Sequence, residues 1–282
     1  MSKYGFFDTK YVLADKGYTG GDKLSIQQFI VMGLVFIVIV AISILLRKVK
    51  KEKVFTIYKV LSIVMPIGEI LKISIETHMD LAHGDAFNLG GLLPLYACSM
   101  LLYFLPFVAW GKGGKMQRWS MAFFISIGLV AGLSNFVYLS AAGWYPLATL
   151  GCLYSIIFHA VIVFVGMSLM ITGIYKPSFK TIYEGMIPVL MFSVIVIPAN
   201  YIIASLKFDI GSYPDYMMLM NCNGFIPKIS DWFANHHIRI LFTFIMLLVA
   251  YPIATALITL IDMGIGKIFE LIFKNKKEKS TI

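Results

Sequence analysis

The sequence predicts an all-α integral membrane protein with seven transmembrane helices, its N-terminus outside and its C-terminus in the cytoplasm. The chain is 59% hydrophobic and only 14% charged, which is far more apolar than a typical soluble domain. Seven apolar stretches are long enough to cross roughly 30 Å of hydrocarbon as helices that rise about 1.5 Å per residue. Within lipid, a single stretch of this kind satisfies its own backbone hydrogen bonds by forming a helix.

The predicted spans divide the chain into a tail, a membrane domain and a second tail. Residues 1–25 are a polar extracytoplasmic tail, since the first apolar stretch starts too late and runs too long for a cleavable signal. Residues 26–262 form the membrane domain, with an outer loop at 206–237. Residues 263–282 are a basic cytoplasmic tail, for which we expect either an interfacial helix or a frayed end. The spans are expected at 26–46, 54–77, 89–110, 118–140, 148–174, 182–205 and 238–262.

The distribution of basic residues predicts the orientation. Most of the 24 lysines and arginines follow the first, third, fifth and seventh spans, whereas the loops 78–88 and 141–147 contain none. The positive-inside rule places the basic loops in the cytoplasm. The net charge of +9 is therefore a topology signal, and no basic stripe interleaved with aromatic residues suggests a nucleic-acid partner. The excess of lysine over arginine suggests a bacterial protein of the cell membrane.

Two short segments resemble binding motifs without matching them. Residues 111–115 read Gly-Lys-Gly-Gly-Lys, but they lack the glycine spacing and the Lys-Ser/Thr pair of a phosphate-binding loop, so we interpret them as a basic turn. The side chains of His78, Asp80, His83 and Asp85 are of metal-ligand type, but their spacing matches no zinc motif. We therefore predict a solvated polar loop and no metal site.

The second span carries charged residues on one face. Glu69, Lys72 and Glu76 are spaced i, i+3 and i+7, which places them on one side of a helix. Charges in hydrocarbon are costly unless they are paired or turned inward. Two interpretations are open: a salt-bridge ladder that fixes helix packing, or a polar cavity where Glu69 orients a catalytic or binding group.

Cys98 and His159 are the candidate catalytic pair. They lie in the apolar segments LLPLYACSM and YSIIFHAVIV, at depths in the third and fifth spans that differ by roughly 3 Å. Pro94 should disturb the helix near the thiol. A buried cysteine is often a small hydrophobe, as we expect for Cys152, and a membrane histidine often bridges helices. The residues alone do not determine whether the two side chains are neighbours.

The order of these residues resembles a known family. Leu93-Pro94-Leu95 with Cys98, then Phe158-His159, then Asn200-Tyr201 resembles the YwaF-like bacterial membrane proteins, which are similar to the transmembrane protein 164 acyltransferase family. The resemblance covers roughly residues 55–262, and Tyr96 stands where the bacterial family usually has histidine. The segments Asp215-Tyr216-Met217 and Asp231-Trp232 resemble its outer loop, and Glu69 occupies the position of an expected acidic residue.

This resemblance implies a seven-helix lipid acyltransferase in which Cys98 is the nucleophile and His159 the general base. An acyl chain would pass from a phospholipid to an acceptor through a Cys98 thioester, with membrane phospholipids as the partners. The candidate oxyanion donors and supporting residues are Asn200, Asn135, Tyr96, Glu69 and Tyr201. No metal or other cofactor is implied. The oligomeric state and the identity of the acceptor are left open; with water as acceptor the same residues would make a lipase.

Two alternatives come from other functional classes. The face formed by Glu69, Lys72 and Glu76 could line the path of a small-solute or proton-coupled transporter, although no inverted repeat is visible in the sequence. The chain could also be a non-enzymatic membrane partner of another protein. Substitution of Cys98 separates these alternatives from an enzyme.

Overall fold

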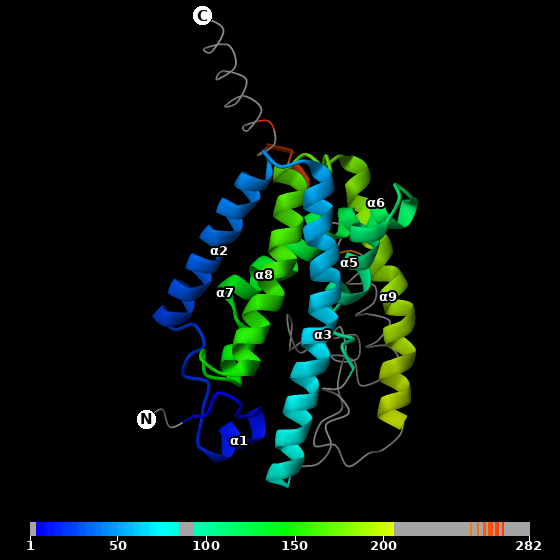
Figure 1. Cartoon of the computed structure of the whole chain (residues 1–282). Coiled ribbons are helices and arrows are strands. Elements are labelled where there is room, and N and C mark those ends of the chain that lie inside the picture. Colours follow the sequence, from blue (N-terminus) through cyan, green and yellow to red (C-terminus); the bar gives the residue numbers. More distant parts are fainter. Residues whose placement is uncertain are drawn as a thin grey trace, which may run out of the picture.

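The computed structural model describes residues 4–84 and 93–205, together with single residues between 249 and 267. Within these residues the chain contains helices and no strand, which confirms the all-α prediction. Helices packed side by side form a bundle, shown in Figure 1. The helical segments long and apolar enough to cross a membrane are α2 (Ile26–Leu46), α3 (Lys51–His83), the run Lys115–Gly143, α8 (Leu150–Ile171) and α9 (Phe179–Ser205).

These five segments support a membrane protein, while seven spans and the orientation of the termini stay predictions. The outer loop 206–237, most of the predicted span 238–262 and most of the tail 263–282 lie outside the described residues. Val249, Ile253 and Leu257, which are described within that last span, are helical.

The prediction of a helix from residue 89 is wrong for residues 93–99, which form turns. The amide of Leu95 donates to the Leu93 carbonyl at 2.8 Å, and that of Ser99 to the Tyr96 carbonyl at 2.9 Å. Pro94 has no N–H and disfavours helical backbone at the residue before it, which explains the interruption. Only α5 (Met100–Trp110) is helical, and its 11 residues extend roughly 16 Å. Cys98 therefore lies on a turn and not within a helix.

The polar loop predicted after residue 77 is also wrong in part, because α3 continues to His83. It ends at Gly84, whose left-handed backbone (φ 91°) is a favourable helix C-terminus. His78, Asp80 and His83 are thus helical, with Asp80 buried, while Asp85 lies outside the described residues. The described residues contain no group of three His, Cys, Asp or Glu side chains that could hold a metal ion.

The run after α5 contains a change of helix type. It consists of α6 (Lys115–Phe123), a π-helical turn η1 (Phe124–Gly128), α7 (Leu129–Val137) and a short 3-10 helix η2 (Ser140–Gly143). Helices α8 and α9 pack closely against it at glycines. A methyl group added at Gly166 of α8 would lie 2.5 Å from the Phe124 carbonyl oxygen, and one at Gly185 of α9 2.5 Å from Ser126 Oγ. Small residues allow such close backbone approach in membrane bundles.

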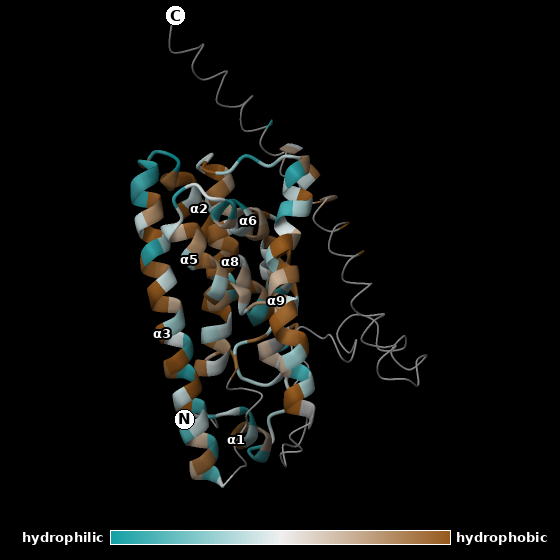
Figure 2. Cartoon of the chain, turned by 90° about the vertical axis from the view of Figure 1, so that its right-hand side faces the viewer, coloured by the Kyte–Doolittle hydropathy of each residue, from teal (hydrophilic) through white to brown (hydrophobic). Residues whose placement is uncertain are grey.

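The two ends of the bundle differ in charge, and the N-terminal segment covers one of them. The loops 47–50, 111–114 and 172–178 lie towards the end drawn at the top of Figure 1 and carry Arg47, Lys48, Lys50, Lys112 and Lys176. The opposite end is covered by the N-terminal segment with α1 (Lys10–Asp15). Hydrophilic residues concentrate near the ends and hydrophobic residues along the middle of α3 and α9 (Figure 2).

Backbone contacts hold the N-terminal segment in place. The amide of Leu150 donates to the Phe6 carbonyl at 2.8 Å, at the first residue of α8. The Tyr18 hydroxyl donates to the Ala142 carbonyl at 2.8 Å. The segment is therefore packed onto the loop that leads into α8.

Candidate functional site

A small cavity lies between α3, the turn at residues 93–99 and α8. Its volume is about 120 Å³. Five of the residues singled out in the sequence line it, namely Glu69, Lys72, Tyr96, Cys98 and His159, although Lys72 was not assigned to the catalytic site. The remaining lining residues are Ser99, Gly151, Tyr154, Ser155 and Phe158. The cavity thus combines a thiol, an imidazole and an ion pair contributed by three separate segments of the chain.

Cys98 is held by the turn that precedes α5. Its thiol is free and its side chain partly buried. Its carbonyl accepts a hydrogen bond from the Leu101 amide at 3.1 Å, in the first turn of α5. The position of the thiol is therefore set by the turn and by the start of α5 together.

His159 lies on α8 with only 6% of its surface exposed. Its Nδ1 is 2.8 Å from the carbonyl oxygen of Ser155. A carbonyl only accepts hydrogen bonds, so Nδ1 carries the proton and the neutral ring keeps a lone pair on Nε2. His159 in this tautomer can accept a proton at Nε2.

The charged face of α3 is both an ion-pair ladder and a wall of the cavity. Lys72 Nζ is 3.7 Å from Glu69 Oε1 and 3.5 Å from Glu76 Oε2. Glu69 and Lys72 also line the cavity. Both interpretations offered by the spacing of these residues therefore describe the same face.

Tyrosines from α8 and from the loop before it contact the charged face of α3, and Tyr154 also lines the cavity. The Tyr145 hydroxyl donates to Glu76 Oε1 at 3.2 Å. Burial raises the pKa of Tyr145 well above its ordinary value, so the phenol keeps the proton that it donates. Lys72 Nζ lies 5.6 Å from the centroid of the Tyr154 ring, and the Tyr154 hydroxyl donates to the Met65 carbonyl at 3.3 Å. These contacts join α3 to α8 beside the cavity.

A comparison with known protein families shows to which family this chain belongs. The model of the TMEM164 family matches residues 23–258, a range that includes all the residues lining the cavity. The chain belongs to the TMEM164 family. The chain matches no curated protein and no solved structure.

Three predicted site residues of this TMEM164 family member do not line the cavity. Asn200 and Tyr201 lie on α9, where Asn200 is 1% exposed. Asn135 lies on α7, where its Nδ2 donates to the Ala131 carbonyl at 3.4 Å. Its buried Oδ1 has no hydrogen-bond partner within the described part of the chain. Cys152 is fully buried within a hydrophobic cluster, in agreement with a packing role.

The lining residues that the sequence analysis did not assign to the site lie mostly on α8. Gly151, Tyr154, Ser155 and Phe158 precede His159 at spacings that bring them to one helical face. That spacing was readable in the sequence once His159 had been singled out. A methyl group at Gly151 would lie 2.7 Å from the Tyr145 ring, so glycine is needed for the tyrosine to pack there.

Proposed function

We propose that this TMEM164 family member is a membrane-embedded lipid acyltransferase. It transfers a fatty acyl chain from a phospholipid to an acceptor through a thioester on Cys98, with His159 as general base. The observation that carries the proposal is that Cys98 and His159, from segments far apart in sequence, line one small cavity of a membrane protein. The resemblance to an acyltransferase family supports it further.

The first half-reaction forms the acyl-enzyme. Nε2 of His159 takes the thiol proton of Cys98, and the thiolate attacks the carbonyl carbon of a phospholipid ester. The tetrahedral intermediate collapses with cleavage of the bond between that carbon and the glyceryl oxygen. His159 returns its proton to this oxygen, and a lysophospholipid leaves.

The second half-reaction restores the thiol. Nε2 of His159 takes a proton from the hydroxyl or amine of the acceptor, which attacks the thioester carbonyl. The carbon–sulfur bond breaks, and the proton passes from His159 to the Cys98 sulfur. Tyr96, which lines the same cavity, is the candidate hydrogen-bond donor to the negative charge that develops on the carbonyl oxygen in both steps.

The size of the cavity limits which part of a lipid can enter it. About 120 Å³ holds roughly four water molecules at about 30 Å³ each, and it cannot hold an acyl chain. The ester group therefore enters the cavity while the chains stay outside, along exposed apolar residues of α3 and α8 such as Ile70 and Ile157. Burial of the site within the membrane keeps water scarce, which favours transfer of the acyl chain over hydrolysis of the thioester.

Acyl transfer to Cys98 can be tested directly. The purified protein is incubated in lipid with a phospholipid that carries an alkyne-tagged acyl chain. We expect hydroxylamine-sensitive labelling that is lost in Cys98→Ser, because an oxygen nucleophile forms no thioester. Labelling in His159→Ala should be slower by about 10²-fold or more, since the thiol then lacks its general base.

Cys152→Ser is the matched control. Cys152 lies on α8, is fully buried and does not line the cavity, so its substitution should leave the labelling unchanged. If a range of donor lipids leaves Cys98 unlabelled in a folded protein, the acyltransferase proposal is wrong. The transporter and partner-protein alternatives require that Cys98→Ser leaves function intact.

A further inference from the structure

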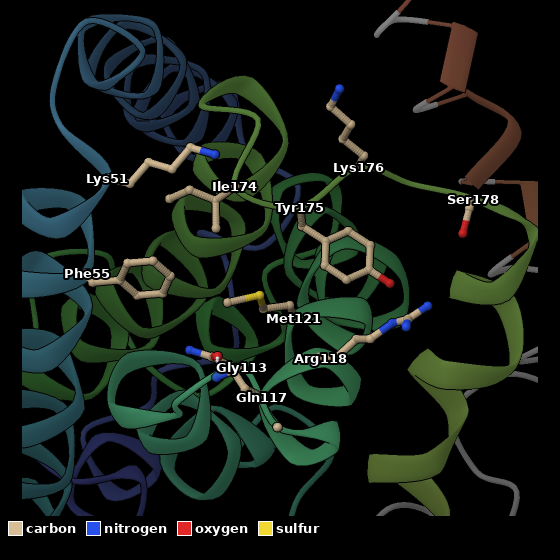
Figure 3. A pocket seen from close by; sticks show the side chains of 11 residues that line it. Lys51, Phe55, Gly113, Gln117, Arg118, Met121, Ile174, Tyr175, Lys176 and Ser178 are labelled. Atoms are coloured by element: carbon tan, nitrogen blue, oxygen red, sulfur yellow. Dashed lines mark hydrogen bonds between the residues drawn. The ribbon is translucent and has the colours of Figure 1, made fainter.

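A second and larger cavity lies at the basic end of the bundle, away from Cys98. Its volume is about 440 Å³, and it opens between the start of α3, the turn before α6 and the loop before α9 (Figure 3). The lining residues are Lys51, Phe55, Gly113, Gly114, Gln117, Arg118, Met121, Ile174, Tyr175, Lys176 and Ser178.

Basic side chains reach this cavity from three separate elements. Lys51 comes from α3, Arg118 from α6 and Lys176 from the loop 172–178, and the described lining contains no acidic residue. Figure 3 shows Lys51 and Arg118 on opposite sides of Tyr175 and Met121, with the Lys176 ammonium turned outward. A flexible lysine side chain can rotate inward onto a bound anion.

One of the three positive charges is already balanced. Arg118 Nε lies 2.9 Å from Glu184 Oε2 of α9. The Tyr175 hydroxyl donates to the same oxygen at 3.2 Å, and burial raises the pKa of Tyr175, so its phenol stays protonated. Glu184 therefore positions Arg118. Lys51 and Lys176 form no ion pair within the described part of the chain, so they supply about two unbalanced positive charges there.

The turn at Gly113 and Gly114, before α6, leaves its backbone accessible from the cavity. Gly113 has a left-handed backbone (φ 81°), and a methyl group at Gly113 or Gly114 would meet no atom within 4 Å. Gln117 fixes this turn, because its Oε1 accepts from the Gly113 amide and its Nε2 donates to the Val108 carbonyl, both at 2.8 Å. The turn before α6 is thus rigid and can be approached closely by a ligand.

The chemistry of the lining defines the ligand class. A phosphate monoester carries a charge of about −1.5 to −2, which matches the unbalanced charge of Lys51 and Lys176. Phe55, Met121 and Ile174 give the cavity an apolar part as well. Basic pockets between membrane helices commonly bind anionic lipid head groups.

We propose that this cavity binds a phosphate monoester, held by Lys51, Arg118 and Lys176. The ligand is either the head group of an anionic lipid or a soluble phosphate monoester. This second site does not depend on acyl transfer at Cys98. The segment 111–115, predicted only as a basic turn, would form one wall of it without being a nucleotide-binding loop.

The two sources of ligand can be distinguished with the purified full-length protein. In nanodiscs of phosphatidylcholine and phosphatidic acid, native mass spectrometry measures which lipid the released protein retains. A parallel calorimetric titration uses sn-glycerol 3-phosphate. We expect either preferential retention of phosphatidic acid or saturable binding of glycerol phosphate, and weaker binding at higher salt.

Charge-neutral variants test the residues involved. Lys51→Gln/Lys176→Gln should weaken binding about tenfold or more, because charge-assisted hydrogen bonds to phosphate are lost. Lys53→Gln is the matched control, since Lys53 is exposed on α3 and does not line the cavity. If the double variant does not fold, Lys176→Gln in the loop serves instead, with a smaller loss expected.

Two results would overturn the proposal. One is that neither phosphatidic acid nor glycerol 3-phosphate binds better than phosphatidylcholine. The other is that the lysine variants bind as well as the unmodified protein. Cys98→Ser should retain full binding, so failure of this proposal is distinguishable from failure of the acyltransferase proposal.

Discussion

Single hydrogen bonds set the chemistry of the side chains in the Cys98 cavity. The bond from His159 Nδ1 to the Ser155 carbonyl, at 2.8 Å, fixes both the tautomer and the ring orientation, because donor and acceptor lie on one helix. The ring therefore needs no carboxylate partner to present Nε2. Lys72 is held in a comparable way between Glu69 and Glu76, so two carboxylates balance its charge.

Lys72, which lies between Glu69 and Glu76, should contribute substantially to the stability of the folded protein. We expect Lys72→Gln to lower the free energy of unfolding by about 2 kcal/mol or more, because two largely buried carboxylates lose their cation. Thermal unfolding in detergent measures this change. The triple variant Glu69→Gln/Lys72→Gln/Glu76→Gln should recover most of the loss. Unchanged stability of Lys72→Gln alone would contradict the ladder.

At the residue scale, the sequence was informative about polar groups in apolar stretches and uninformative about their neighbours. The free-energy cost of placing a polar group within hydrocarbon singles out Glu69, Cys98 and His159, and these three residues line one cavity. The same argument singles out Asn135 and Asn200, which do not line it. Helical periodicity gives the face of a residue on its own helix, but the partner helix depends on packing of the whole bundle.

At the scale of elements, the glycine contacts fix the distance between helices. Phe124 begins the π-helical turn, and its carbonyl faces Gly166 of α8. A methyl group at Gly132 of α7 would lie 2.6 Å from Val163 Cγ2, so a second close approach holds α7 against α8 near His159. Helix α8 is thus in tight contact with the run Lys115–Gly143 at residues that lie one and two turns after His159, on the same side of the helix.

Gly166→Ala should destabilise the protein by about 2 kcal/mol, because its methyl group would meet a backbone carbonyl that cannot rotate away. Gly33→Ala is the matched control: it lies within α2, where an added methyl group meets no atom within 4 Å. That substitution should be neutral or stabilise by up to about 1 kcal/mol, since alanine favours helix. Equal unfolding temperatures of the two variants would contradict the packing described.

Helix existence was predictable from hydropathy, but helix ends were less so. The first predicted span agrees with α2, because a polar tail and a basic loop flank it. The helix α3 continues beyond its apolar part, since polar residues such as His78 form helix equally well outside a hydrophobic stretch. Pro94 predicted a disturbance near Cys98, yet the extent of the turn follows from its own backbone hydrogen bonds.

At the scale of the whole molecule, the bundle is electrically asymmetric. The loops between α2 and α3, α5 and α6, and α8 and α9 bring lysines and arginines to one end (Figure 1). The cavity with Lys51, Arg118 and Lys176 lies at that end, and the N-terminal segment covers the other. The positive-inside rule predicts that the basic end faces the cytoplasm.

Cysteine accessibility tests this orientation. Cys222 lies in the predicted outer loop 206–237 and would itself react, so it is first replaced by serine. In this Cys222→Ser background, a membrane-impermeant maleimide should label Ala14→Cys in intact cells. It should label Lys48→Cys only after permeabilisation. Both positions are exposed, at opposite ends of the bundle. The reverse pattern would show that the protein is inserted the other way round.

The docking of the N-terminal segment has a consequence for the order of folding. Tyr18 and Asp22 bond to Ala142 and Leu147, partners that lie 124 and 125 residues later in the chain. At about 5–20 residues per second, a ribosome needs roughly 6–25 s to synthesise the intervening chain. The segment must therefore wait undocked while the first helices insert, and the end of the bundle next to the start of α8 closes only after about half of the 282 residues have been synthesised.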